Sequence, residues 1–154
     1  MGIKDDVKQI AGESGMDKVG FGSVDRLEGI PSADPSYLLP GTRTVISLVA
    51  ANDRDAIRAY LSKKDQTAYG TDMTETYKRI FRAGRAIARE LEERGHESIN
   101  VVPNFSYREQ REPYDMIPDF SHRYGAVAAG TGLMGWSGNL MTPEHGAAVH
   151  LGSV

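Results

Sequence analysis

Apolar residues recur at helical and strand spacing over the first third of the chain. Residues 3–11 place apolar side chains three and four positions apart, as on one helix face, and Gly15 lies where that helix would end. The short run 19–24 and the β-branched run 44–51 predict two strands. The connection between them carries three prolines, which predicts irregular structure. The chain therefore opens as helix, strand, loop and strand.

Helical and strand patterns continue to the end of the chain. Residues 74–95 keep their apolar positions on one face, which predicts a long amphipathic helix that ends at Gly95. Residues 98–102 predict a third strand, and residues 147–154 predict a fourth. If the last of these strands has an open edge, two copies of the chain could pair there as a homodimer.

The region between these last two strands begins with a loop. Residues 103–119 are polar and broken by prolines, and such a length without regular structure favours a functional loop. A helix then begins near Asp119 or Ser121, either of which could cap it, and runs into a glycine-rich segment. A turn at residues 142–146 follows.

The composition is that of one globular domain spanning residues 1–154, with 40% hydrophobic and 25% charged residues. A net charge of −3 with interspersed signs provides no basic stripe for nucleic acid, which favours a small-molecule ligand. The chain has no cysteine, so it offers neither a thiolate nucleophile nor thiolate ligands for an iron–sulfur cluster. Any electron donor must therefore come from outside it.

The sequence predicts neither export nor membrane insertion. Residues 1–10 lack the apolar stretch of a signal peptide. The apolar run 45–51 is far shorter than the roughly 20 residues that a membrane-spanning helix needs. We therefore expect a cytoplasmic protein without membrane association.

The glycine-rich segment GTGLMGWSGN, residues 130–139, contains the spacing G-x-G-x-x-G. In a dinucleotide-binding fold, a strand precedes this pattern and a helix follows it. Here the predicted helix precedes the glycines, which argues against that reading. A helix C-cap would explain one or two glycines. Four of them around Trp136 favour a backbone that approaches a flat or bulky ligand: Gly130, Gly132, Gly135 and Gly138.

The stretch AAGTGLMGWSGNLMTPEHG, residues 128–146, resembles the cobalamin-binding domain shared by epoxyqueuosine reductase and the corrinoid-dependent reductive dehalogenases. Three other stretches resemble the same domain in order. They are GMDKVGFGSVDRL for its first strand, YLLPGTRTVISLVA for its second strand and TETYKRIFRAGRAIARELEERG for its long helix. The resemblance covers nearly the whole chain.

This resemblance implies a nitroreductase-like α/β fold, a three-layer sandwich in which helices cover both faces of a mixed sheet. It also implies a corrinoid (cobalamin) held in base-off form and a ferredoxin-type electron donor with 4Fe-4S clusters in a separate or missing module. The chain would then be either a single corrinoid-binding domain or a fragment of a longer iron–sulfur protein. Backbone amides and carbonyls along a glycine-rich wall suit a wide ring fringed with amide groups.

The resemblance and the local chemistry together nominate the site residues. The candidates for proton transfer to a reduced small-molecule or modified-nucleoside substrate are Asp115 and Asp119, which could act if burial raised a pKa. The candidates for cofactor binding lie in the glycine-rich segment, apart from two residues that precede it: Gly130, Gly132, Leu133, Met134, Gly135, Trp136, Gly138, Asn139, His122 and Tyr107. No side-chain spacing predicts a metal site.

Several alternatives remain open at this point. Asp119 could instead cap the helix, Asp115 could be a solvated turn residue, and His122 could be a helix histidine, a contact at the edge of the ligand or a cobalt ligand. Leu133 and Trp136 stand where epoxyqueuosine reductases usually carry an aromatic residue and a lysine, so the substrate is not fixed. A non-catalytic corrinoid carrier and an FMN-binding protein of the same fold are the competing functions.

Overall fold

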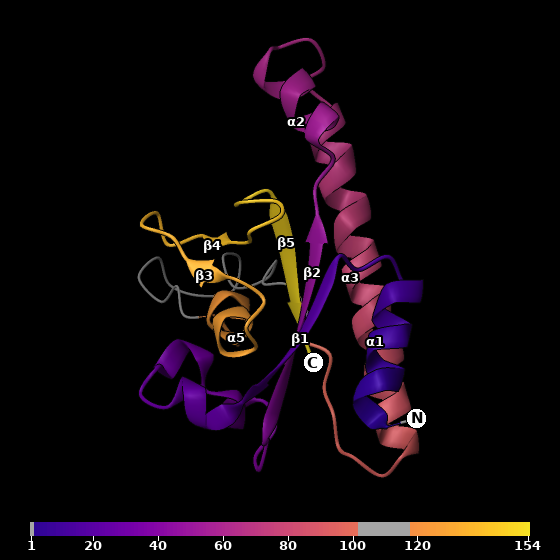
Figure 1. Ribbon diagram of the computed structural model, residues 1–154, viewed down its shortest axis with the longest axis vertical. Coiled ribbons are helices and arrows are strands. Elements are labelled where there is room, and N and C mark those ends of the chain that lie inside the picture. The colour runs from indigo at the N-terminus through magenta and orange to yellow at the C-terminus, as the bar shows by residue number, and fades with distance from the viewer. Residues whose placement is uncertain (1, 102–117) are drawn as a thin grey trace.

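A three-stranded antiparallel sheet lies at the centre of the computed structural model, which describes residues 2–101 and 118–154. Its order is β1 (Lys18–Ser23), β2 (Thr44–Ala51) and β5 (Val149–Ser153). Residues 45–50 of β2 are all buried, because helices cover both faces of this central strand (Figure 1).

Two helices, α1 (Ile3–Glu13) and α3 (Ala68–Glu93), pack on one face of the sheet (Figure 1). Their apolar stripes meet the alternate side chains of β2 that point to this face. The buried residues of this cluster are Val7, Ala11, Met16, Ile46, Leu48, Ala50, Ile80, Ala83 and Ile87. Most of the apolar core therefore lies between the sheet and these two helices.

A short helix, α5 (His122–Ala128), covers the opposite face of the sheet (Figure 1). It approaches β1 closely because that strand carries glycine where its side chains would meet the helix. A Cβ atom at Gly22 would lie 2.8 Å from the carbonyl carbon of Ala128, and one at Gly20 would overlap the Ala129 carbonyl oxygen. A smaller buried cluster lies on this face: Leu27, Ala33, Val45, Phe120 and Ala128. The expected three-layer α/β sandwich is confirmed.

The other elements lie at the margins of the sandwich. Helix α2 (Arg54–Leu61) and the first turns of α3 extend beyond the end of β2 (Figure 1). Strands β3 (Leu133–Met134) and β4 (Leu140–Met141) form a small antiparallel hairpin that packs on α5. The connection from β1 to β2 contains three 3-10 helices: η1 (Val24–Leu27), η2 (Pro31–Ala33) and η3 (Pro35–Tyr37).

Most predicted elements are confirmed, with shifted ends. The β-branched run 44–51 is a strand over its whole length, and the long helix starts six residues earlier than expected, at Ala68. The prediction of irregular structure for the proline-containing connection was wrong in detail. Pro31 and Pro35 each occupy the first position of a 3-10 helix, where proline is tolerated because that position needs no backbone N–H donor.

The third strand predicted at residues 98–102 is wrong over its described part. Only Val101 bridges to the sheet, through its N–H and the Ser153 carbonyl at 3.0 Å. The preceding side chains bind α3 instead, since Ser98 Oγ donates to the Ala88 carbonyl at 2.8 Å and Asn100 Nδ2 donates to the Phe81 carbonyl at 3.3 Å. These contacts hold the segment on the helix rather than along β5.

The pairing of the strands also differs from the expected mixed sheet. Every pairing among the described residues is antiparallel, including the Val101–Ser153 bridge. The reason is that β2 lies between β1 and β5 and runs opposite to both of them. Strand β5 forms one edge of this described sheet, so pairing of two copies there stays a prediction. Over the described residues, no helix has the length and apolar character needed to cross a membrane.

Candidate functional site

The glycine-rich segment begins by ending helix α5. The Gly130 N–H donates to the Val127 carbonyl and the Thr131 N–H donates to the Ala126 carbonyl, both at 3.0 Å, with Gly130 at φ +69°. These two bonds define a Schellman motif, whose left-handed residue is usually glycine. Gly130 therefore redirects the chain from α5 into the hairpin.

Replacing Gly130 tests this turn in isolation. A Cβ atom there would meet nothing within 4 Å, so the only penalty is the left-handed backbone. We expect Gly130→Ala to lower the free energy of unfolding by about 1–2 kcal/mol, measured by urea denaturation. Gly130→Asn should lose less, because asparagine tolerates this conformation. Equal stability of all three proteins would contradict the Schellman assignment.

The remaining glycines build the β3–β4 hairpin. The Gly138 N–H donates to the Gly135 carbonyl at 2.9 Å, and the Gly135 N–H donates to the Asn139 carbonyl at 2.8 Å. With Gly138 at φ +74°, this is a three-residue hairpin loop that ends in a left-handed glycine. A Cβ atom at Gly132 would lie 2.6 Å from the Met141 carbonyl oxygen. The two strands therefore approach closely only because glycine stands there.

The G-x-G-x-x-G spacing is thus a helix stop followed by a tight hairpin. Helix α5 precedes it and strand β4 follows it, which excludes the strand–turn–helix order of a dinucleotide site. All four glycines have a structural role in the turn or the hairpin, so the expectation that such roles explain only one or two was wrong. Their facing a ligand stays a prediction.

The hairpin presents large apolar side chains to solvent. Leu133 and Met141 are cross-strand partners, so they share one face, and they are 73% and 42% exposed. Trp136 in the loop is fully exposed. The other pair, Met134 and Leu140, lies on the opposite face, where Leu140 is buried. The hairpin therefore has one anchored face and one open apolar face.

A buried hydrogen-bond chain anchors the start of the hairpin to the sheet. The hydroxyls of Ser47 in β2 and Thr131 lie 3.1 Å apart, and Thr131 Oγ1 donates to the Ala126 carbonyl at 3.0 Å. Both side chains are at most 1% exposed. The Arg123 guanidinium also donates to the Gly138 carbonyl in the hairpin loop. The sequence did not predict these contacts. Ser47 is a single polar residue in an apolar strand, and nothing near it in the sequence indicates that it contacts Thr131.

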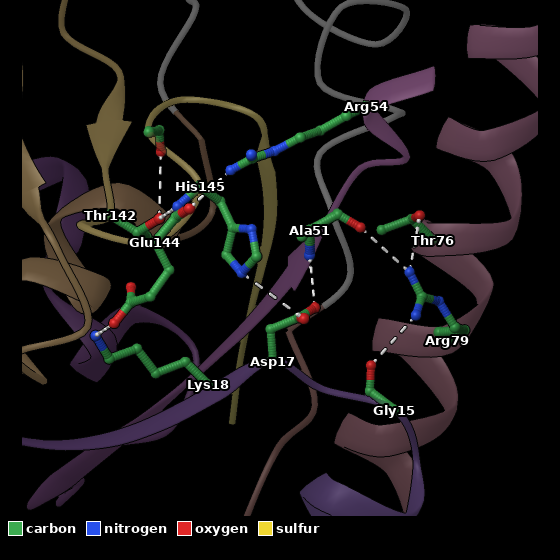
Figure 2. A network of polar contacts seen from close by, with 11 residues as sticks. Gly15, Asp17, Lys18, Ala51, Arg54, Thr76, Arg79, Thr142, Glu144 and His145 are labelled. Carbon is green, nitrogen blue, oxygen red and sulfur yellow. Dashed lines mark hydrogen bonds and ion pairs between the residues drawn. The ribbon is translucent and has the colours of Figure 1, made fainter. Parts of the chain in front are cut away.

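The turn that follows the hairpin is anchored separately. Lys18 Nζ lies 3.4 Å from Glu144 Oε1, and Arg54 Nη2 donates to the Glu144 carbonyl at 2.8 Å (Figure 2). His145 Nε2 lies 3.8 Å from Asp17 Oδ1, and the other Asp17 oxygen accepts the Ala51 N–H at 2.8 Å. The sequence predicted only a turn here. The structure shows that the turn ties the hairpin to β1, β2 and α2.

Arg79 of α3 extends the same polar network on the other side of Ala51 (Figure 2). Its guanidinium donates to the carbonyls of Gly15 and Ala51 at 3.3 and 3.4 Å and to the Thr76 hydroxyl at 3.2 Å. The network therefore joins α3, the end of β2 and the turn before β1. Arg79 thus stabilises the end of β2 at Ala51, next to Asp17, which contacts the turn at His145.

His122 lies at the start of α5, against the sheet. Its Nδ1 and the Ser153 Oγ are 2.9 Å apart, and its ring meets Phe120 edge-on at 6.2 Å between centroids. Burial lowers the pKa of His122 to about 4, so the imidazole is neutral at pH 7. Its buried Nε2 has no hydrogen-bond partner in the described part of the chain. A contact with cobalt or with the edge of a ligand stays a prediction.

Asp119 does not cap α5, so that interpretation was wrong. The N-cap position is Ser121, whose side chain makes no capping bond, while its N–H donates to the Ser32 carbonyl at 2.7 Å. Asp119 is exposed two residues earlier and is followed by Phe120, which is 1% exposed. The buried ring and the Ser32 bond therefore fix the backbone beside Asp119. Asp115 and Tyr107 lie outside the described residues.

Of the predicted site residues, the structure brings the hairpin positions 130–139 together on α5, with His122 and Asp119 near the other end of that helix. Among residues 2–101 and 118–154, no three histidine, aspartate or glutamate side chains lie together in a way that could hold a metal ion. The candidate site is the exposed apolar face of the hairpin, and polar contacts hold the hairpin against α5 and the sheet.

The fold defined by these elements is an α/β sandwich with helices on both faces of the sheet. No protein-family model and no curated protein matches the chain. Solved structures do match. The epoxyqueuosine reductases from Bacillus subtilis and Streptococcus thermophilus align over 98% and 99% of this chain, with TM-scores of 0.60 and 0.59 and identities of 18% and 16%.

A third match is an epoxyqueuosine reductase bound to an epoxyqueuosine-modified tRNA-Tyr stem loop, with a TM-score of 0.52 and 16% identity over 98% of the chain. The chain spans only 44–45% of the length of these three proteins. At such identities the likeness establishes the fold. The chain therefore has the α/β fold that forms a little under half of the epoxyqueuosine reductases.

Proposed function

We propose that residues 1–154 form one corrinoid-binding domain of a reductase that works with an external iron–sulfur electron donor. The observation that carries the proposal is the open apolar face of the glycine hairpin, in a fold shared with epoxyqueuosine reductases. An exposed tryptophan beside an exposed leucine and methionine is costly in water unless something covers it.

The described residues fit such a group. A corrinoid is a wide, flat ring, and the cross-strand pair Leu133 and Met141 provides an apolar platform on one face of the hairpin. Positions 132, 135 and 138 are glycine, so no side chain at these positions would stand between the hairpin backbone and a bound ring. Thr131 and Arg123 hold the backbone from behind, so the platform is formed before a ligand arrives.

The chain's own residues would bind and orient the ring rather than react. Leu133 and Met141 on the open face and Trp136 in the loop would exclude water from it, while hairpin backbone groups would meet its amide fringe. When bound, a corrinoid supplies a redox-active cobalt centre that can pass electrons to an organic substrate. The absence of cysteine means that thiolate-held iron–sulfur clusters would have to be provided by another module.

A reduced substrate also needs a proton, and Asp115 and Asp119 are the proposed donors. One solved epoxyqueuosine reductase is described with its catalytic aspartate loop swung out of the active site. This supports an aspartate carried on a loop as the acid. Asp119 is held by its buried neighbour Phe120, so a carboxyl group at that position would be presented from a fixed backbone.

The proposed substrate is a small organic molecule or a modified nucleoside. The reductase bound to a modified tRNA stem loop supports the second possibility for a protein of this fold. Leu133 and Trp136 would be the first side chains to shape selectivity, because both are largely exposed on the hairpin.

Trp136→Ala separates binding from folding. Because the ring is fully exposed, we expect the variant to keep its free energy of unfolding within about 0.5 kcal/mol. Its dissociation constant for cob(II)alamin should rise about tenfold, through the loss of aromatic contact area. Anaerobic titration followed by visible absorption measures this constant.

The matched control is Tyr37→Ala, which removes another aromatic ring that is 75% exposed but lies in η3. This variant should bind cob(II)alamin as the unmodified protein does. Equal binding by all three proteins would show that the hairpin tryptophan takes no part in cofactor binding.

A further inference from the structure

A depression lies on the opposite face of the sheet from the glycine hairpin. Its volume is about 620 Å³, within the range of small-molecule sites. The walls come from α1, the adjoining strands β1 and β2, the loop before β2 and the residues after α3. Phe21 packs with the core on the α1 and α3 side, whereas its neighbours Gly20 and Gly22 face α5. The two sites are therefore separated by the sheet.

The floor of the depression is apolar. Val7 and Ile46 are buried at its base, and Phe21 and Leu91 are half-buried around them. These side chains belong to or pack against the main hydrophobic cluster. An apolar ligand placed here would extend the core outward and bury the remaining exposed carbon surface.

The rim carries two cations without carboxylate partners among the described residues. Lys4 Nζ lies 5.5 Å from the centroid of the Phe21 ring, which places the ammonium over the aromatic floor. Arg43 is exposed on the loop that leads into β2, and its side chain makes no hydrogen bond or ion pair with any residue that the structure describes. The nearby acid Asp6 is already paired with Arg94 at 2.7 Å. Glu97 is the one carboxylate side chain along the described lining.

We infer that this depression binds a small apolar molecule that carries a single carboxylate. The apolar floor would take the hydrocarbon part, while Lys4 and Arg43 would pair with the anionic group. Such a site is independent of the corrinoid proposal, since none of these residues belongs to the hairpin or to α5.

The test uses 4-phenylbutanoate and its uncharged amide as a matched pair of probes. Amide chemical shifts of the full chain, recorded by ¹⁵N NMR during titration, should change around Lys4, Phe21 and Arg43 and not in residues 130–142. The carboxylate should bind about fivefold or more tightly than the amide, as expected for one or two exposed ion pairs.

Single substitutions at the rim complete the experiment. Lys4→Gln and Arg43→Gln should each weaken binding of the carboxylate about two- to fivefold and leave binding of the amide unchanged. Lys8→Gln, an exposed position on the same helix outside the depression, is the control and should change neither. Equal affinity for the two probes, shift changes centred on the hairpin or no saturable binding would each overturn the inference.

Discussion

Lowering the pH from 7 to 4 is expected to destabilise the protein by about 3 kcal/mol through His122 alone. Burial holds the pKa of this imidazole at about 4, against an ordinary value of 6.5 in the unfolded chain. Between these two values the unfolded state binds a proton that the folded state does not, so acid favours unfolding. The contribution is complete above pH 6.5 and is lost as the pH falls toward 4.

Urea denaturation at several pH values measures this effect. Through His122, the free energy of unfolding should fall by about 1.2 kcal/mol per pH unit between pH 6 and 4.5, and His122→Gln should remove most of this slope. His150→Gln is the comparison, because burial also lowers the pKa of His150 but Asp72 opposes the shift and the ring is less buried. That variant should retain most of the slope. An unchanged slope in His122→Gln would contradict the buried, neutral state of this histidine.

Gly22→Val is expected to cost about 3 kcal/mol of stability. A Cβ atom at this position would lie 2.8 Å from both the Ala128 carbonyl carbon and the Ala129 nitrogen, which are backbone atoms that cannot rotate away. The variant therefore forces α5 off the sheet. The midpoint of urea denaturation measures the loss, provided that its slope is unchanged.

Gly12→Ala is the matched control for this substitution. Gly12 lies inside α1, and a Cβ atom there would meet nothing within 4 Å. Alanine should therefore stabilise the helix by about 0.5–1 kcal/mol. If Gly22→Val is as stable as the unmodified protein, then α5 does not rest directly on β1.

Elements with a strong local pattern were predictable. The strand 44–51 is apolar and β-branched because both of its faces are covered, and α1 keeps its apolar residues on one side. Helix α2 was missed although it carries a usable signal. Asp53 caps it by accepting the N–H groups of Asp55 and Ala56 at 2.7 and 3.3 Å, as expected of aspartate at an N-cap.

The supports of the candidate site were not predictable, because they join distant parts of the chain. The ion pair between Lys18 and Glu144 spans 126 residues, and the contact between Ser47 and Thr131 spans 84. Nothing in the sequence around these four residues indicates which distant residue each of them contacts. The segment 98–101 also shows how tertiary contacts override strand propensity, since its side chains bind α3 instead of extending the sheet.

The glycines show how one pattern supports two physical explanations. Their density around Trp136 predicts a backbone that faces a ligand, yet the helix stop and the hairpin account for all four positions. What the structure adds is the exposure of Leu133, Trp136 and Met141 beside them. The prediction of a ligand now depends on these side chains rather than on the glycines.

Anaerobic titration of the protein with cob(II)alamin, followed by electron paramagnetic resonance, tests the central proposal most directly. We predict saturable binding with a base-off cobalt(II) signal, and its loss in Gly132→Val, because a Cβ atom there would lie 2.6 Å from the Met141 carbonyl oxygen and would open the hairpin. Tyr37→Ala should bind normally. An unchanged spectrum of free cob(II)alamin at all protein concentrations, or equal binding by Gly132→Val, would contradict the proposal that this hairpin holds a corrinoid.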